Sequence, residues 1–143
     1  MEINKIEINK KNKIIFTILA GIISIIFCII KERQDILHSY LVETSNNINL
    51  DLPMIINSDL RFDSTAVLRW NKFAYYYTYY THSLEDFDKK NFEYNLKDFL
   101  INNARTNAQL NNFQYFKITF VYIFKDKDGN EIKEIKITYK EYK

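Results

Sequence analysis

The chain has 143 residues, of which 47% are hydrophobic and 16% aromatic, enough apolar surface for a folded core and too much for a disordered tail. Its formal net charge of +2 comes from residues 1–13, because residues 31–143 hold equal numbers of basic and acidic side chains. A domain with balanced charge lacks the basic footprint that binds phosphates, so no nucleic-acid partner is expected.

The first predicted element is a transmembrane helix at residues 14–30, IIFTILAGIISIIFCII, which contain no charge and no proline. As a helix these residues rise about 25 Å, and the flanking Lys13, Lys31 and Arg33 can extend to the two bilayer interfaces. A buried core segment and a cleaved signal peptide are the alternatives. A signal peptide needs small residues at its cleavage site, whereas Ile30 leads directly into charged residues. An uncleaved signal anchor is therefore the expected form.

The orientation follows from the lysines and arginines on either side of this helix. Four lysines precede the segment, and two basic residues follow it closely. Because positive charge is retained in the cytoplasm, the C-terminal part is expected in the periplasm or outside the cell. The predicted organisation is a cytoplasmic tail at 1–13, the bilayer-bound helix at 14–30, a juxtamembrane helical stalk at 31–46 and an extracytoplasmic α+β domain at 47–143.

The smaller side chains of the membrane helix fall on one stripe. At 100° per residue they lie within an arc of about 100°. The five are Thr17, Ala20, Gly21, Ser24 and Cys28. Since close backbone approach favours helix pairing in lipid, the stripe predicts a homodimer through this helix, with another protein's helix or coincidence as alternatives.

The next stretch of sequence indicates an edge strand and a hairpin. Residues 48–56 alternate between apolar and polar side chains, and Pro53 restricts them to an edge strand or an extended segment. Residues 66–70 and the aromatic stretch 73–81 read as two strands, joined by a two-residue turn at Asn71–Lys72.

A helix and a second hairpin follow. Ser83 and Asp86 resemble a capping box, and the residues after them place apolar side chains on one helical face, at Phe92, Leu96, Phe99, Leu100 and Ala104. Residues 113–124 and 131–139 alternate as strands around an Asp-Gly turn. The predicted fold is α+β: a transmembrane helix, then a small antiparallel sheet in the order hairpin–helix–hairpin, with one helix packed on a face.

The sequence carries no catalytic motif. With only Gly21 and Gly129, it cannot form a phosphate loop, a dinucleotide fingerprint or a nucleophile elbow. Neither His38 nor His82 has an acid or nucleophile at a motif-like spacing. The residues from Asp126 resemble part of a calcium loop but lack its later ligands, and a hairpin turn accounts for them. No catalytic residue, metal ligand or cofactor is therefore predicted.

Tyrosines give the most unusual local feature of the sequence. Tyr75, Tyr77 and Tyr79 share one face of the predicted strand and are the candidate binding residues, because exposed tyrosines stack on sugars or anchor protein partners. The alternative is that they face the core or cover neighbouring strands.

Four stretches of the domain resemble a known group of proteins. They are PMIINSDLRFDS from Pro53, Tyr77–Thr78, NNARTN from Asn102 and YIFKDKDG from Tyr122. The group consists of small uncharacterised bacterial proteins with one N-terminal membrane helix and a short extracytoplasmic α+β domain. The resemblance covers most of residues 50–142. It implies an envelope protein and brings no activity or site residues.

These observations predict a membrane-anchored extracytoplasmic binding or assembly module with an envelope protein as its partner. A small envelope enzyme acting on sugars or cell-wall material is one alternative, and an immunity-type inhibitor is another. Converging tyrosine, histidine and aspartate side chains in a polar cleft would favour the enzyme, whereas an exposed tyrosine surface would favour the binding module.

Overall fold

The computed structural model describes residues 2–107 and 110–143, with side chains from residue 13 onward. The chain divides into two compact units, Met1–Leu37 and His38–Lys143. Helix α1 spans Glu2–Asn49, so its last three turns or so, residues 38–49, belong to the second unit. The extended segment predicted from residue 48 therefore begins later, because the helix continues to Asn49.

In the first unit, α1 carries the hydrophobic segment. Its apolar side chains between Ile14 and Ile30 are 49–75% exposed. By length and composition α1 is the one helix in the described part of the chain that could cross a membrane, with a mean hydropathy of 2.7 in its most apolar window. The segment is compatible with a signal anchor or a membrane helix.

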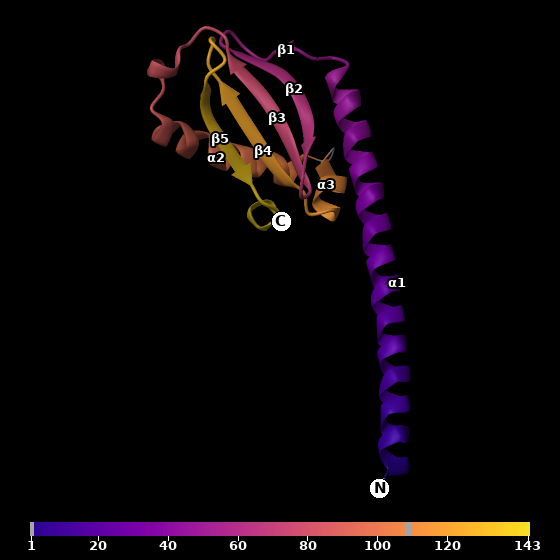
Figure 1. Ribbon diagram of the computed structural model, residues 1–143. Coiled ribbons are helices and arrows are strands. Elements are labelled where there is room, and N and C mark those ends of the chain that lie inside the picture. Colours follow the sequence, from indigo (N-terminus) through magenta and orange to yellow (C-terminus); the bar gives the residue numbers. More distant parts are fainter. Residues whose placement is uncertain (1, 108–109) are drawn as a thin grey trace. The chain divides into compact units, whose positions relative to one another are not determined.

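The second unit is built on a five-stranded sheet in the order β1-β2-β3-β4-β5 (Figure 1). The strands are β1 (Met54–Ile55), β2 (Leu60–Leu68), β3 (Lys72–Tyr79), β4 (Thr119–Lys125) and β5 (Glu131–Ile137). Neighbouring strands are antiparallel except β3 and β4, which are parallel. The predicted α+β fold with hairpin, helix and hairpin is confirmed. The sheet is mixed rather than wholly antiparallel because the helical connection returns the chain to the end of the sheet where β3 began.

The connection between the hairpins contains η1 (Leu84–Asp86), α2 (Lys89–Thr106) and α3 (Asn111–Tyr115), and α4 (Tyr139–Tyr142) follows the sheet. The Ser83 capping box forms but begins only the short turn η1. Helix α2 begins later, where the Asp88 carboxylate accepts hydrogen bonds from the backbone N–H groups of Lys90 and Asn91. The strand predicted from residue 113 is wrong at its start, because α3 occupies those residues.

The core lies between one face of the sheet and the helices, with α2 behind the sheet in Figure 1. Alternate residues of β4 and β5 face this core, and they meet Leu41 of α1, Leu100 of α2 and Phe113 of α3, all at most 7% exposed. On the opposite face of the sheet, Ala74, Val121 and Ile123 form a smaller apolar cluster. Period-two alternation thus supplies both faces.

The C-terminal end of α1 protects the outer edge of β2. Strand β1 pairs with β2 only at Arg61 and Phe62. Further along β2, the Asn49 side chain forms the hydrogen bonds to the strand backbone instead. The Asn49 Nδ2 donates to the Thr65 carbonyl at 3.0 Å, and the Thr65 N–H donates to Asn49 Oδ1 at 2.7 Å. The hydroxyls of Ser45 and Thr65 lie 2.9 Å apart. A side-chain amide thus replaces the peptide group of a neighbouring strand and fixes residues 38–49 against the sheet.

The turn between β2 and β3 is longer than the two-residue turn predicted at Asn71–Lys72, because Leu68 pairs with Lys72 and leaves three residues, 69–71, between the strands. Within this loop Trp70 and Asn71 have φ of 66° and 54°. Positive φ suits Asn and strains a bulky residue such as Trp. The Asp-Gly turn between β4 and β5 is confirmed, with Gly129 at φ 85°.

Candidate functional site

The second unit contains a cavity of about 370 Å³ on the helix-covered face of its sheet. Its floor is aromatic and comes from β2, β3 and β4, one wall comes from α1, and the remaining walls come from the end of α2 and from α3. The lining residues are Thr44, Ile48, Phe62, Tyr75, Tyr77, Asn103, Asn107, Leu110, Phe113 and Tyr122. A volume of this size is in the range of small-ligand sites, roughly 300–1,000 Å³.

The floor is ordered by the register of the strands. Tyr75 lies opposite Tyr122 in the parallel pair, and their rings stack at 5.2 Å with an interplanar angle of 11°. Phe62 lies opposite Tyr77, and these rings stack at 4.8 Å and 20°. Because side chains two apart share a face, the four rings form two stacked pairs side by side. The result is a rigid apolar floor.

Burial keeps the tyrosines of the floor neutral. It raises the pKa of Tyr77 to about 12, and it raises the pKa values of Tyr75 and Tyr122 well above the ordinary value. Among the described residues no fully buried side-chain oxygen or nitrogen lacks a hydrogen-bond partner. The cavity therefore offers flat apolar surface with a few neutral hydrogen-bonding groups.

Two of the three predicted binding tyrosines line this cavity, Tyr75 and Tyr77. Tyr79 faces the same side of the sheet but packs beyond the cavity, with its ring 5.0 Å from Phe87 and 5.8 Å from Phe92. Sequence reasoning missed Tyr122, although its place in the alternating strand put it beside Phe120 and Phe124. Nothing in the sequence around Thr44 and Ile48 indicated that these residues of α1 would form a wall of the cavity.

The five small residues of the apolar segment 14–30 lie in the first unit, where Cys28 is exposed. They are Thr17, Ala20, Gly21, Ser24 and Cys28. Association through this stripe, with a second copy or another helix, stays a prediction.

Folding brings together one polar cluster that sequence spacing does not reveal. The Thr81 hydroxyl lies 2.8 Å from Asp59 Oδ1 and 2.8 Å from His82 Nδ1. Hydrogen bonds from Thr81 and then Ser58 lower the pKa of Asp59. In a catalytic triad the histidine lies between nucleophile and acid, whereas here the hydroxyl is central and donates to the carboxylate. The cluster therefore organises a loop and does not activate a nucleophile.

Asp126, the first calcium-like residue of the β4–β5 turn, accepts hydrogen bonds from nitrogen donors with both of its carboxylate oxygens. Asp126 accepts from the N–H groups of Asp128 at 3.0 Å, Asn130 at 2.7 Å and Leu84 at 3.0 Å, and from the Asn130 side chain at 3.0 Å. The Asn130 side chain contributes most to a lowered pKa of Asp126. In the part of the chain with described side chains, no three His, Cys, Asp or Glu residues could hold a metal ion.

A larger hollow of about 710 Å³ lies along α2 and carries different chemistry. Four lysines line it, and Glu93 forms an ion pair with Lys133 at 2.7 Å. Tyr94 in the same hollow is 79% exposed. Long exposed charged side chains form a solvated surface, so we take the aromatic cavity as the candidate site.

Comparison with known proteins shows the fold. No protein-family profile matches the chain, and no curated protein matches it. A Pseudomonas aeruginosa protein described as secreted is similar in structure, with a TM-score of 0.65 and 14% identity over 75% of this chain and 93% of that one. A pilotin of the type 2 secretion system of Vibrio vulnificus has a TM-score of 0.63 and 12% identity over 78% and 96%.

A type II secretion system pilotin from Vibrio cholerae is also similar, with a TM-score of 0.59 and 11% identity over 78% of this chain and 97% of that one. The three structures match nearly along their full lengths at low identity. The chain therefore shares its α+β fold with small secretion-related proteins.

Proposed function

We propose that this protein is a membrane-anchored binding module for assembly in the bacterial envelope, and that its aromatic cavity holds an apolar segment of a partner protein. Residues 14–30 provide the anchor, and the unit His38–Lys143 faces away from the cytoplasm. The aromatic cavity carries the proposal, because it is a partly enclosed, mainly apolar site that the fold builds from separate elements.

The chemistry of the lining supports binding rather than hydrolysis. The described lining residues include no Asp, Glu, His, Lys or Arg. Cleavage of a glycosidic bond normally uses two carboxylates, one as acid and one as base or nucleophile. Aromatic rings with neutral hydroxyl and amide groups recognise an apolar side chain and orient its backbone instead.

The fold supports an envelope role. Two of the similar structures are pilotins of type II secretion systems, and a third protein is described as secreted. A module of this fold, tethered by a hydrophobic helix, is suited to a partner that is inserted in or passes through the envelope. That partner is the envelope protein expected from the sequence.

Site-specific photo-crosslinking in living cells tests the proposal. A benzophenone amino acid at Thr44 places the reactive group in the α1 wall of the cavity, and the same amino acid at Tyr94 serves as the exposed control. We expect one envelope protein to crosslink at Thr44 and not at Tyr94. Filling the cavity with Ile48→Trp should abolish that adduct, whereas Phe99→Trp on exposed α2 surface should not.

Two results would contradict the cavity as the binding site. One is an adduct at Thr44 that persists in full when Ile48→Trp fills the cavity of a folded chain. The other is the same partner at Thr44 and Tyr94 with equal yield, which would indicate contact without a specific site.

A further inference from the structure

The charges of the second unit are separated between the two ends of its sheet. One end consists of the turn 69–72, residues 111–119 and residues 138–143, and we call it the basic end. It carries one acid, Glu141, against the basic residues Arg69, Lys72, Lys117, Lys140 and Lys143. The acidic end consists of the loops 50–60, 80–88 and 126–131, in which Lys127 is the one basic residue against eight acids.

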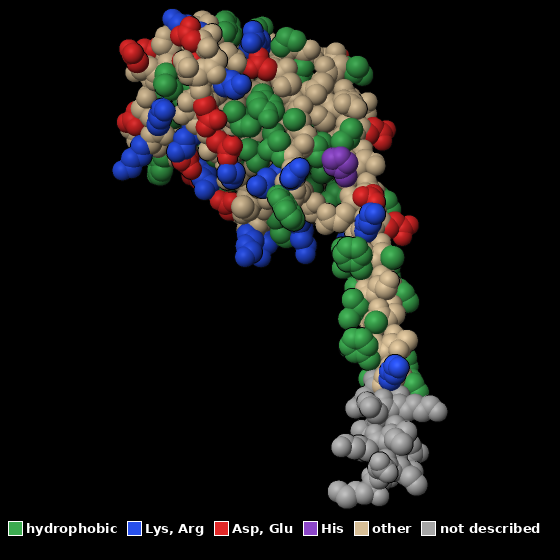
Figure 2. Space-filling view, in the orientation of Figure 1, with side chains coloured by type: hydrophobic (Ala, Val, Ile, Leu, Met, Phe, Trp, Pro, Cys, Tyr) green, Lys and Arg blue, Asp and Glu red, His purple; other side chains and the backbone are tan. Residues whose placement is uncertain are grey.

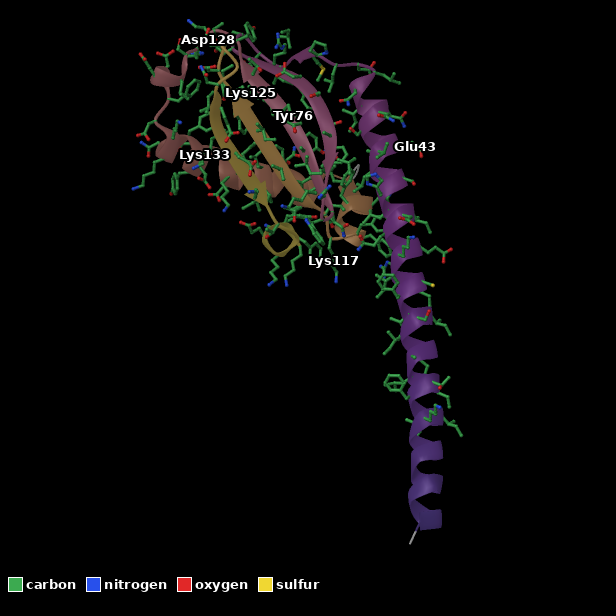
Figure 3. The ribbon with its side chains drawn as sticks, viewed as in Figure 1. Glu43, Tyr76, Lys117, Lys125, Asp128 and Lys133 are labelled. Carbon is green, nitrogen blue, oxygen red and sulfur yellow. The ribbon has the colours of Figure 1, made fainter. Side chains whose placement is uncertain are left out.

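Contacts hold each set of segments together. At the basic end the Thr119 N–H donates to the Asn71 carbonyl at 2.9 Å, the Tyr142 hydroxyl donates to the Ile118 carbonyl, and the Lys117 ammonium lies 5.9 Å above the Tyr139 ring. Figure 3 labels Lys117 at this end of the sheet and Asp128 at the other. Lysine and arginine side chains gather along the lower edge of the unit in Figure 2.

The basic end also exposes aromatic side chains. Trp70 is 86% exposed and Tyr115 is 70% exposed. Trp70 adopts a φ of 66°, which is unfavourable for a bulky side chain, in a turn where glycine or asparagine would cost less. An apolar ring held in strained backbone and directed into solvent contributes nothing to the core. Strain and exposure together suggest that the ring has a function outside the unit.

The chain enters the second unit at this same end. Tyr40, in the first turn of α1 within the unit, has its ring tilted against those of Phe113 and Phe116 in the α3 region, at 6.2 and 5.9 Å between ring centroids. Asn112 Nδ2 donates to the Tyr40 hydroxyl at 3.1 Å. Eight residue steps separate Ile30 from His38, which span at most about 28 Å even when fully extended. If residues 14–30 cross a bilayer, its headgroups are within reach of the basic end.

We propose that the basic end docks on anionic phospholipid headgroups, with Trp70 inserted at the interface and Arg69, Lys117 and Lys140 beside it. Tryptophan and tyrosine favour the level of the headgroups, and lysine and arginine are attracted to anionic lipid. This docking rests on the anchor in the proposed function. It orients the unit on the membrane and directs the acidic end into the aqueous compartment.

The single tryptophan of the chain makes the test direct. The full chain is reconstituted in vesicles of phosphatidylcholine, with or without phosphatidylglycerol, and its fluorescence reports Trp70 alone. In vesicles with phosphatidylglycerol we expect a blue-shifted emission, protection from acrylamide and quenching by headgroup spin-labelled lipid. High salt should reverse all three effects, because the attraction is screened.

Lysine substitutions then distinguish electrostatic docking from a unit that merely lies close to the membrane because of its anchor. Each of Lys117→Gln and Lys140→Gln should lower the ratio of docked to undocked unit about fivefold, the usual effect of one basic residue near an anionic surface. Lys127→Gln at the acidic end is the matched control and should change nothing. Flotation of the vesicles tests the anchor separately.

The outcomes are distinct. A chain that does not float with the vesicles refutes the anchor, and docking with it. A chain that floats while Trp70 remains red-shifted and equally quenched by acrylamide in both kinds of vesicle refutes docking alone. If Trp70 is protected from acrylamide to the same extent at high salt and in both lysine variants, the assignment to anionic headgroups is also overturned.

Discussion

Replacing Asn49 by alanine tests how residues 38–49 of α1 are held against the sheet within the second unit. The substitution removes two hydrogen bonds to the Thr65 backbone and one from the Thr65 hydroxyl at 3.1 Å. It also leaves an N–H and a carbonyl of β2 without this partner at a residue that is 5% exposed.

The magnitude follows from the number of bonds. Three hydrogen bonds at about 0.5–1.5 kcal/mol each give a loss of about 3 kcal/mol. Unfolding entropy scales with length at about 2 cal/mol/K per residue, so residues 38–143 should unfold with about 0.2 kcal/mol/K. The melting temperature of the unit should therefore fall by roughly 13 °C for a loss of this size.

The assay is thermal unfolding of the full chain in detergent micelles, followed by near-UV circular dichroism of the core tyrosines. Hydrogen exchange of a peptide covering β2 should show faster exchange in the variant. Asn46→Ala is the matched control, because Asn46 is exposed on the same helix. If Asn49→Ala has the same melting temperature as Asn46→Ala and the wild type, the Asn49 amide does not stabilise the edge of β2 and the reasoning fails.

Three further predictions concern ionisation and topology. Tyr77 has a pKa raised by burial to about 12, so its stabilising effect is complete below pH 10 and is lost as the pH rises towards 12. In the wild type the free energy of unfolding should therefore fall by about 2–3 kcal/mol over this range because of Tyr77, and Tyr77→Phe should remove that loss. Urea unfolding at a series of pH values measures it, and the same pH dependence in variant and wild type would contradict the prediction. Asp126 has a pKa below its usual 3.8, so its contribution is present above that pH and lost as the pH falls further. Asp126→Asn should lower the melting temperature at neutral pH, and the difference in melting temperature between variant and wild type should shrink in acid. A difference that stays constant with pH would contradict the stabilising role of the Asp126 hydrogen bonds in the turn. Alkaline phosphatase fused after Lys143 should be active, whereas an inactive fusion with an active cytoplasmic reporter would reverse the orientation.

The β4–β5 hairpin could be predicted from sequence because its pattern is local. Alternation in FVYIF and EIKEIKI set the faces, and the Asp-Gly pair fixed the turn. The strand predicted at residues 66–70 covers only the last three residues of β2, and a register shift between Phe62 and Ser64 interrupts the pairing of the part that was missed. Residues 48–49 remained helical against their alternating pattern because Asn49 gains its partners at Thr65, a contact that no local window contains.

The cavity could be predicted only in part for the same reason. Tyr75 and Tyr77 drew attention because they lie in an unusual aromatic run. Their partners come from other elements: Ile48 from α1, Phe113 from α3 and Tyr122 from β4. A site assembled from segments that are far apart in the sequence leaves no regular residue spacing by which it could be predicted, whereas a turn or a strand does.

The parallel pairing of β3 with β4 has a kinetic consequence. Each hairpin joins strands that are close in sequence, but Lys72 pairs with Thr119, and everything from η1 to α3 lies between them. Closing that long connection costs chain entropy before its contacts form, so it should be the slow step of folding. Until it occurs, two separate hairpins expose aromatic faces to the solvent. Substitutions that strengthen α2, and so shorten the flexible connection, should speed folding more than equal stabilisation of either hairpin turn.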